Sequence, residues 1–122
     1  MLLYISDHKT VEELQDRFND CFPNLRIEFY READDAKEKD FKKSNLVKSY
    51  ERIGDIRIKS YTGVLDIKSW DKTSQIKKEF KEVFGLNIQL FRLYKDQWIP
   101  ATYSDELTLK QQCDLARGYA VI

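Results

Sequence analysis

Several residue types that carry chemistry are scarce in this chain. Its 122 residues include one histidine, two cysteines, two prolines and four glycines. With no C-x-x-C spacing and a single histidine, the sequence offers no zinc-ligand set. It also contains no G-x-G-x-x-G, Walker or G-x-S-x-G motif, which excludes the phosphate-cradling loops and nucleophile elbows that these motifs build. We therefore expect neither a metal nor a cofactor.

The chain has no surplus of either charge. Lys+Arg and Asp+Glu are equal at 21 each, although charged residues make up 34% of the sequence. Nucleic-acid-binding proteins usually carry a basic surplus, because neutralising phosphates supplies much of their affinity. The balance counts against a nucleic-acid partner.

Long hydrophobic runs are missing as well. No apolar stretch approaches the ~20 residues that a membrane span needs. The N-terminal MLLYISDHK has a short apolar run with no basic segment before it, which is not the pattern of a secretory signal peptide. The sequence predicts one soluble, cytoplasmic domain over residues 1–122 with no membrane partner.

The first third of the chain reads as strand, helix and strand. Residues 2–5 are short and apolar, and Thr10 with Glu13 forms a T-x-x-E capping box that opens a helix. One face of that helix is predicted to carry Val11, Leu14, Phe18, Cys21 and Phe22. Residues 25–30 then alternate between apolar and polar side chains, as in a half-buried strand.

A second unit follows the same plan. It has a strand at 64–67, a helix capped by Asp71 or Thr73 and ended by Gly85, and an exit strand from Leu86. The apolar positions correspond at an offset of 62 residues, and of 61 after Pro23, which matches Gly85. The matched pairs are Leu3/Leu65, Ile5/Ile67, Leu14/Ile76, Phe18/Phe80, Cys21/Val83, Phe22/Phe84, Leu25/Leu86, Ile27/Ile88, Phe29/Leu90 and Arg31/Arg92. True duplication explains the match, and so does chance likeness of two such units. The shared F-x-x-x-F and the closing arginines favour duplication.

Two similar β-α-β units predict an α+β, two-layer sandwich in ferredoxin-like order, in which helix-joined strands are parallel and helices cover one face of the sheet. A β-grasp-like fold is the less favoured alternative. After a tight turn at Lys95-Asp96, residues 97–102 are predicted as an extra edge strand, because Pro100 has no N–H for a ladder. A T-x-x-Q box at Thr108 opens a C-terminal helix that Gly118 closes.

The segment between the two units has little apolar content. Residues 32–45 mix charges of both signs and are predicted to form a solvated, mobile loop. The stretch that follows is ambiguous, since Ile56 and Ile58 alternate as in a strand while Leu46, Tyr50 and Ile53 are spaced as in a short helix.

Few residues are candidates for catalysis. His8 lies in a predicted loop, where a surface or capping role is the usual one, and Cys21 and Cys113 are predicted to be reduced thiols in the core. The acids Asp34 and Asp35 fall in the charged loop, where nothing is expected to tune their pKa. We assign no catalytic residue. An enzyme stays an alternative only if residues far apart in the sequence form an active site that the sequence does not show.

Binding has stronger candidates. On the exit strands Tyr30 and Phe91 point away from the core-facing side chains, Arg31 and Arg92 follow them, and Tyr94 and Trp98 lie near the extra strand. Aromatic and arginine side chains are the usual anchors of protein interfaces. The alternative is that Tyr30, Phe91 and Trp98 complete a second core under the C-terminal helix.

The motif FGLNIQLFR, with Trp98 six residues on and LTLKQQ after it, resembles a family of small uncharacterised bacterial proteins of Bacteroidetes type. The resemblance covers residues 64–118, and neither the charged loop nor the ARGYAVI tail matches it. It implies a stable cytoplasmic domain and brings no activity, cofactor or partner.

The leading hypothesis is a non-enzymatic domain that binds a protein partner or itself. The first alternative is a nucleic-acid-associated regulator that uses an open sheet face to stack bases, although the RNP signature of RNA-recognition motifs is absent. The second is an enzyme of unrecognised type.

Overall fold

The computed structural model describes residues 1–31, 45–58 and 61–118, and these form an α+β protein of two layers. The predicted charged loop at 32–45 lies outside the described residues except for Asn45. The elements are β1 (Leu2–Ile5), α1 (Val11–Cys21), β2 (Leu25–Tyr30), η3 (Ile53–Asp55), β3 (Gly63–Asp66), α2 (Thr73–Phe84), β4 (Asn87–Tyr94), β5 (Gln97–Pro100), η4 (Thr102–Ser104) and α3 (Leu109–Ala116).

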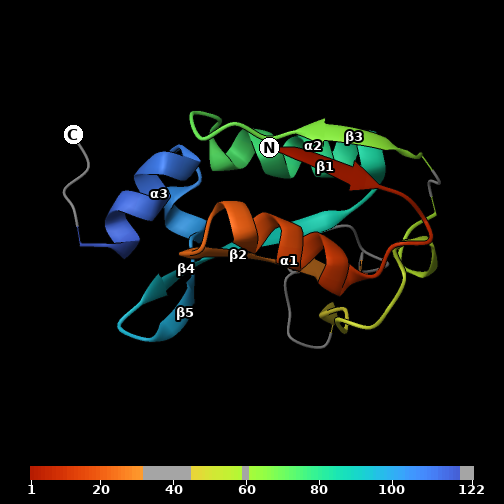
Figure 1. Ribbon diagram of the computed structural model, residues 1–122, viewed down its shortest axis with the longest axis horizontal. Coiled ribbons are helices and arrows are strands. Elements are labelled where there is room, and N and C mark those ends of the chain that lie inside the picture. Colours follow the sequence, from red (N-terminus) through yellow and green to blue (C-terminus); the bar gives the residue numbers. More distant parts are fainter. Residues whose placement is uncertain (32–44, 59–60, 119–122) are drawn as a thin grey trace.

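The described strands form two antiparallel sheets (Figure 1). β1 pairs with β3, while β2, β4 and β5 form a three-stranded sheet in that order. The α+β class and the order of elements are confirmed. The expectation of parallel strands within each unit was wrong, because α1 carries the chain from one sheet to the other, as α2 does. Each strand of the first unit therefore pairs with a strand of the second.

One hydrophobic core lies between the sheets and the inner faces of α1 and α2. Phe18 and Phe80, one from each helix, are fully buried, and Phe80 meets Phe29 of β2 edge to face with ring centroids 6.0 Å apart. Leu3 and Leu65 close the core from the two-stranded sheet. Because both units fill the same core, neither unit has a core of its own.

The pairing of the strands follows the offsets found in the sequence. Leu3 faces Leu65 in the first sheet, and Glu28 faces Gln89 in the second. Each of these pairs joins residues that the repeat makes equivalent. An approximate two-fold axis that exchanges the two units must pass between the partners of both pairs.

Backbone hydrogen bonds at the start of the helices repeat in the same way. The N–H of Val11, the first residue of α1, donates to the carbonyl of Glu51, and that of Thr73, the first residue of α2, donates to Leu107. In both cases a carbonyl from a later loop accepts the helix N–H that has no partner within the helix. The loop after each unit thus anchors that unit's own helix.

This anchoring explains one wrong prediction. The N-cap of α2 is Lys72, whose side chain makes no capping bond, and not Asp71 or Thr73. The Asp71 carboxylate accepts from the N–H of Lys68, and the Thr73 hydroxyl donates to the Leu107 carbonyl at 3.0 Å. By contrast Thr10 caps α1 as predicted, accepting from the Glu13 N–H, although among the described residues this is the one half of the predicted capping box that forms.

Two predicted core residues lie outside the core. Cys21 is exposed, and so is Val83, its equivalent in α2. Each is followed directly by a phenylalanine, and Phe22 or Phe84 takes the inward position at the end of the helix. Only one of two adjacent helical residues can face the core there.

Other local predictions are confirmed. Gly85 ends α2 in the left-handed conformation with φ 66°, and the capping box at Thr108 is complete, with Gln111 as its partner. The ambiguous stretch is neither strand nor α-helix: η3 begins at the buried Ile53, and Ile58 is fully exposed.

Candidate functional site

The β4–β5 hairpin extends beyond the body of the molecule, at the lower left in Figure 1. Its two turn residues, Lys95 and Asp96, have φ of 46° and 64°, the backbone of a tight type I′ turn, which confirms the turn predicted there. β5 is an edge strand, as predicted, because β4 is its one neighbour among the described strands. The hairpin displays two large aromatic side chains, Tyr94 at 49% and Trp98 at 37% exposure.

The predicted surface residues divide between the two faces of this sheet. Trp98 pairs with Leu93, and alternation along β4 places Phe91 on their face, together with Tyr30 of β2. Tyr94 lies on the opposite face, with the Lys95 ammonium 5.3 Å from its ring. Tyr30 is buried, and Phe91 is half-buried. We call the face that carries Trp98, which is opposite the core-facing side chains of β2 and β4, the outer face of the sheet. Trp98 is therefore its exposed aromatic side chain.

The two predicted arginines bond within the protein. Arg31 forms an ion pair with Glu51, which itself accepts from the N–H of Lys48. Arg92 donates from Nη1 to Oε1 of Gln112 at 2.8 Å, and Gln112 is fully buried in α3. Arg31 thus fastens the loop that follows β2, and Arg92 fastens α3 to β4.

A cavity of about 300 Å³ lies beside Trp98, between the hairpin and the polar side of α1. It is lined by Glu12, Gln15, Asp16, Asn19, Arg26, Ser49 and Trp98. Within α1 these residues occupy one stripe, since their spacings of three and four place them on one face of the helix. The cavity thus combines an indole ring with the side chains of an acidic helix face.

Two of the lining residues hold the helix against the sheet. Gln15 donates from Nε2 to the Ile27 carbonyl at 2.9 Å, and Asn19 donates from Nδ2 to the Leu25 carbonyl at 3.0 Å. These bonds join α1 to the backbone of β2. The amide side chains of the cavity are therefore structural.

The charged side chains that line the cavity differ in whether they have an ion-pair partner. Arg26 pairs with Glu28 at 2.7 Å. Glu12 and Asp16, one turn apart on α1, are exposed and form no ion pair with another residue that the structure describes. The carboxylates available to a partner are these two, and the group that suits them is a cation.

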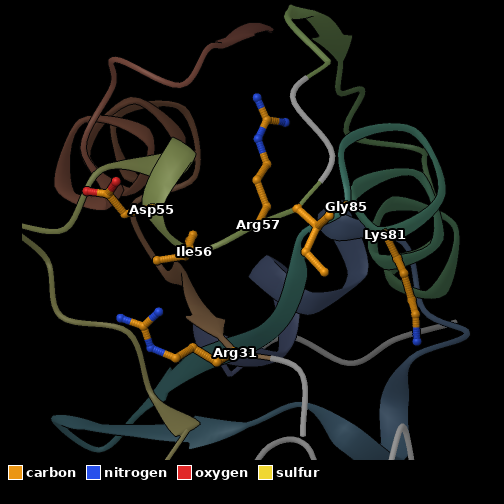
Figure 2. A pocket seen from close by; sticks show the side chains of 7 residues that line it. Arg31, Asp55, Ile56, Arg57, Lys81 and Gly85 are labelled. Carbon is orange, nitrogen blue, oxygen red and sulfur yellow. The ribbon is translucent and has the colours of Figure 1, made fainter. Parts of the chain in front are cut away.

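A second cavity, of about 500 Å³, lies by the end of α2 and is lined mainly by Arg31, Asp55, Ile56, Arg57, Lys81 and Gly85. Figure 2 shows the Arg57 side chain directed away from Arg31 and Asp55. Its guanidinium donates to Asp7 Oδ1 and to the Phe84 carbonyl. Carboxylates of the protein thus neutralise two of the three cations, Arg31 and Arg57, and we assign this cavity no ligand.

The residues considered for catalysis, His8, Cys21 and Cys113, line neither cavity. His8 is exposed, and its backbone carbonyl accepts from Arg52. Cys21 is exposed, whereas Cys113 is buried, and burial raises the pKa of the Cys113 thiol. Within the described part of the chain, no cluster of His, Cys, Asp and Glu is placed to hold a metal ion. No helix among the same residues is long and apolar enough to cross a bilayer.

Comparison with protein families, curated proteins and solved structures found no match for this chain. The resemblance stated from FGLNIQLFR stays a prediction. Sequence reasoning missed Glu12 and Asp16 as site residues. The available signal was the acidic stripe of the helix, but nothing in the sequence places that stripe beside Trp98.

Proposed function

We propose that this protein is a non-enzymatic interaction domain that binds a protein through the outer face of the β4–β5 hairpin. The observation that carries the proposal is the exposed Trp98 on a hairpin held by a tight turn. A rigidly held indole loses little conformational freedom on binding and buries a large area, which is why tryptophan is frequent among interface anchors. Leu93, half-buried, lies beside it on the same face.

We also propose that the two halves of the chain arose by duplication. The equivalent pairs Leu3/Leu65 and Glu28/Gln89 on the approximate two-fold axis support this, as do the matching bonds from Val11 and Thr73 to later loops. Chance likeness of two strand–helix–strand units accounts for apolar spacing but has no reason to produce the same pairing centre in both sheets.

Affinity capture with matched tryptophan variants tests the interaction. The chain has two tryptophans, and Trp70 is 70% exposed and outside the hairpin. We expect Trp98→Ala to lose a protein that the wild type and Trp70→Ala both retain at low salt. Equal retention by all three would refute the assigned surface. Nucleic acid captured at low salt and lost at high salt would instead favour the nucleic-acid alternative.

A further inference from the structure

The two equivalent helices carry net charge of opposite sign. α1 has four acids and one arginine (Glu12, Glu13, Asp16, Asp20 and Arg17), whereas α2 has three lysines and two glutamates (Lys77, Lys78, Lys81, Glu79 and Glu82). The repeat makes Asp16 equivalent to Lys78, and Arg17 equivalent to Glu79. The balanced net charge of the chain therefore conceals a clearly acidic α1 and a mildly basic α2.

The stripe that lines the Trp98 cavity changes most between the two helices. At the positions of Gln15, Asp16 and Asn19 in α1, α2 carries Lys77, Lys78 and Lys81. Lys77 is held inside the protein by Asp105 at 2.9 Å. Lys78 and Lys81 are exposed and form no ion pair with another residue in the described ranges.

We propose that the Trp98 cavity binds lysine side chains of α2 from a second copy of this chain. Lys78 of one copy meets Glu12 and Asp16 of the next, and Trp98 lies against the lysine, where the face of an indole ring attracts an ammonium group. Arg17 and Glu79 add a further pair of opposite sign. Asp20 and Glu82 are the exposed equivalents of like charge, in the last turn of each helix.

This contact joins two different faces, so it does not close on itself. An α1 face used by one neighbour leaves the α2 face of the same copy free for another, and a heterologous contact of this kind forms open chains or rings. The inference rests on the proposed function, because it names the partner of the same Trp98 surface.

Charge-reversal variants of the intact protein provide the test. At low salt we expect wild-type mass to rise with concentration above the 14.6 kDa of one chain, and to return to it at high salt. Asp16→Lys removes the acidic face and Lys78→Asp the basic one, so each variant alone should stay monomeric, with association weakened more than about ten-fold. An equimolar mixture keeps one intact face of each kind and should stop at a dimer.

Further measurements test whether a variant loses association because it misfolds or because its overall charge has changed, and not because the contact is lost. Glu13→Lys makes the same charge change on the same helix, outside the cavity lining, and should associate as the wild type does. Circular dichroism should show the same helix content in all variants. With Trp70→Phe added to Lys78→Asp, Trp98 is the one tryptophan left, and its emission should change saturably on titration with an Asp16→Lys chain that lacks both tryptophans.

Several outcomes would overturn the inference. These are a wild type that stays monomeric at every concentration in low salt, a mixture that forms no dimer, or Trp98 emission that does not change. A monomeric wild type that still captures another protein through Trp98 would overturn self-association and leave the interaction domain standing. Self-association with the expected charge pattern that survives Trp98→Ala would instead refute the assigned role of Trp98.

Discussion

Replacing Asp7 by asparagine removes the charge partner of a guanidinium that is closed off from solvent. The Arg57 side chain is 0% exposed and donates to Asp7 Oδ1 from Nε at 3.0 Å and from Nη2 at 2.8 Å. Its Nη1 donates to the Phe84 carbonyl at 2.8 Å. Asparagine keeps the shape and a carbonyl acceptor. It leaves the positive charge buried without its counter-charge.

The magnitude follows from the burial of the two partners. Removing one member of a buried ion pair costs roughly 3–5 kcal/mol, because the other charge stays desolvated. Asp7 is 33% exposed, so water screens part of this pair, and we expect a loss at the lower end, about 3 kcal/mol. With an unfolding entropy of about 2.1 cal/mol/K per residue, this lowers the Tm by roughly 12 °C.

Urea unfolding at neutral pH measures the effect, and Arg57→Met is its matched comparison. Methionine fills much of the space without a charge, and leaves mainly the Phe84 carbonyl without its donor, so we expect a smaller loss of about 1–2 kcal/mol. The double variant should lose about as much unfolding free energy as Arg57→Met alone, and much less than the sum of the two single losses, since the residues are in contact. A loss for Arg57→Met as large as that for Asp7→Asn would refute the reasoning.

The two thiols should differ in reactivity with an aromatic disulfide reagent. The exposed Cys21 should react at once, whereas Cys113, which is buried and whose pKa is raised by burial, should react only after unfolding. Two thiols that react equally fast would contradict these positions. Burial, and then the charge of Glu28, raise the pKa of Tyr30 above the ordinary value of 10.0. The unfolded chain then ionises first, so the free energy of unfolding should fall as the pH rises above 10, and Tyr30→Phe should lessen that fall in a pH series of urea melts. Gly85→Ala should cost about 1 kcal/mol, because Gly85 has φ 66°, and an unchanged Tm would count against strain at this position.

Local features were predictable where the cause lies within a few residues. The apolar stripes of α1 and α2, the left-handed Gly85, the turn at Lys95 and the capping box at Thr108 each depend on neighbours in the sequence. Their spacing and side-chain chemistry therefore predict them without knowledge of the fold.

The candidate site was only half predictable. Trp98 and Tyr94 were expected at the surface because an edge hairpin exposes its side chains, and they lie there. Arg31 and Arg92 were assigned to the same surface, but Glu51 and Gln112 accept their hydrogen bonds. Both arginines were expected to close a strand, but only Arg31 follows its strand directly, whereas Arg92 lies within β4. In both cases the position of a later segment decides which partner the arginine meets.

Hydrophobic periodicity along the sequence was enough to predict the α+β class, the order of the elements and the matching apolar positions of the two units, because it shows which face of each element is buried. Tertiary structure alone decided which strands pair, since a period of two identifies a face but no neighbour. The tertiary structure also decides that the first N–H of α1 donates to the Glu51 carbonyl and the first N–H of α2 to the Leu107 carbonyl. The cavity beside Trp98 depends on the same choice, because pairing β2 with β4 places the acidic stripe of α1 next to the hairpin.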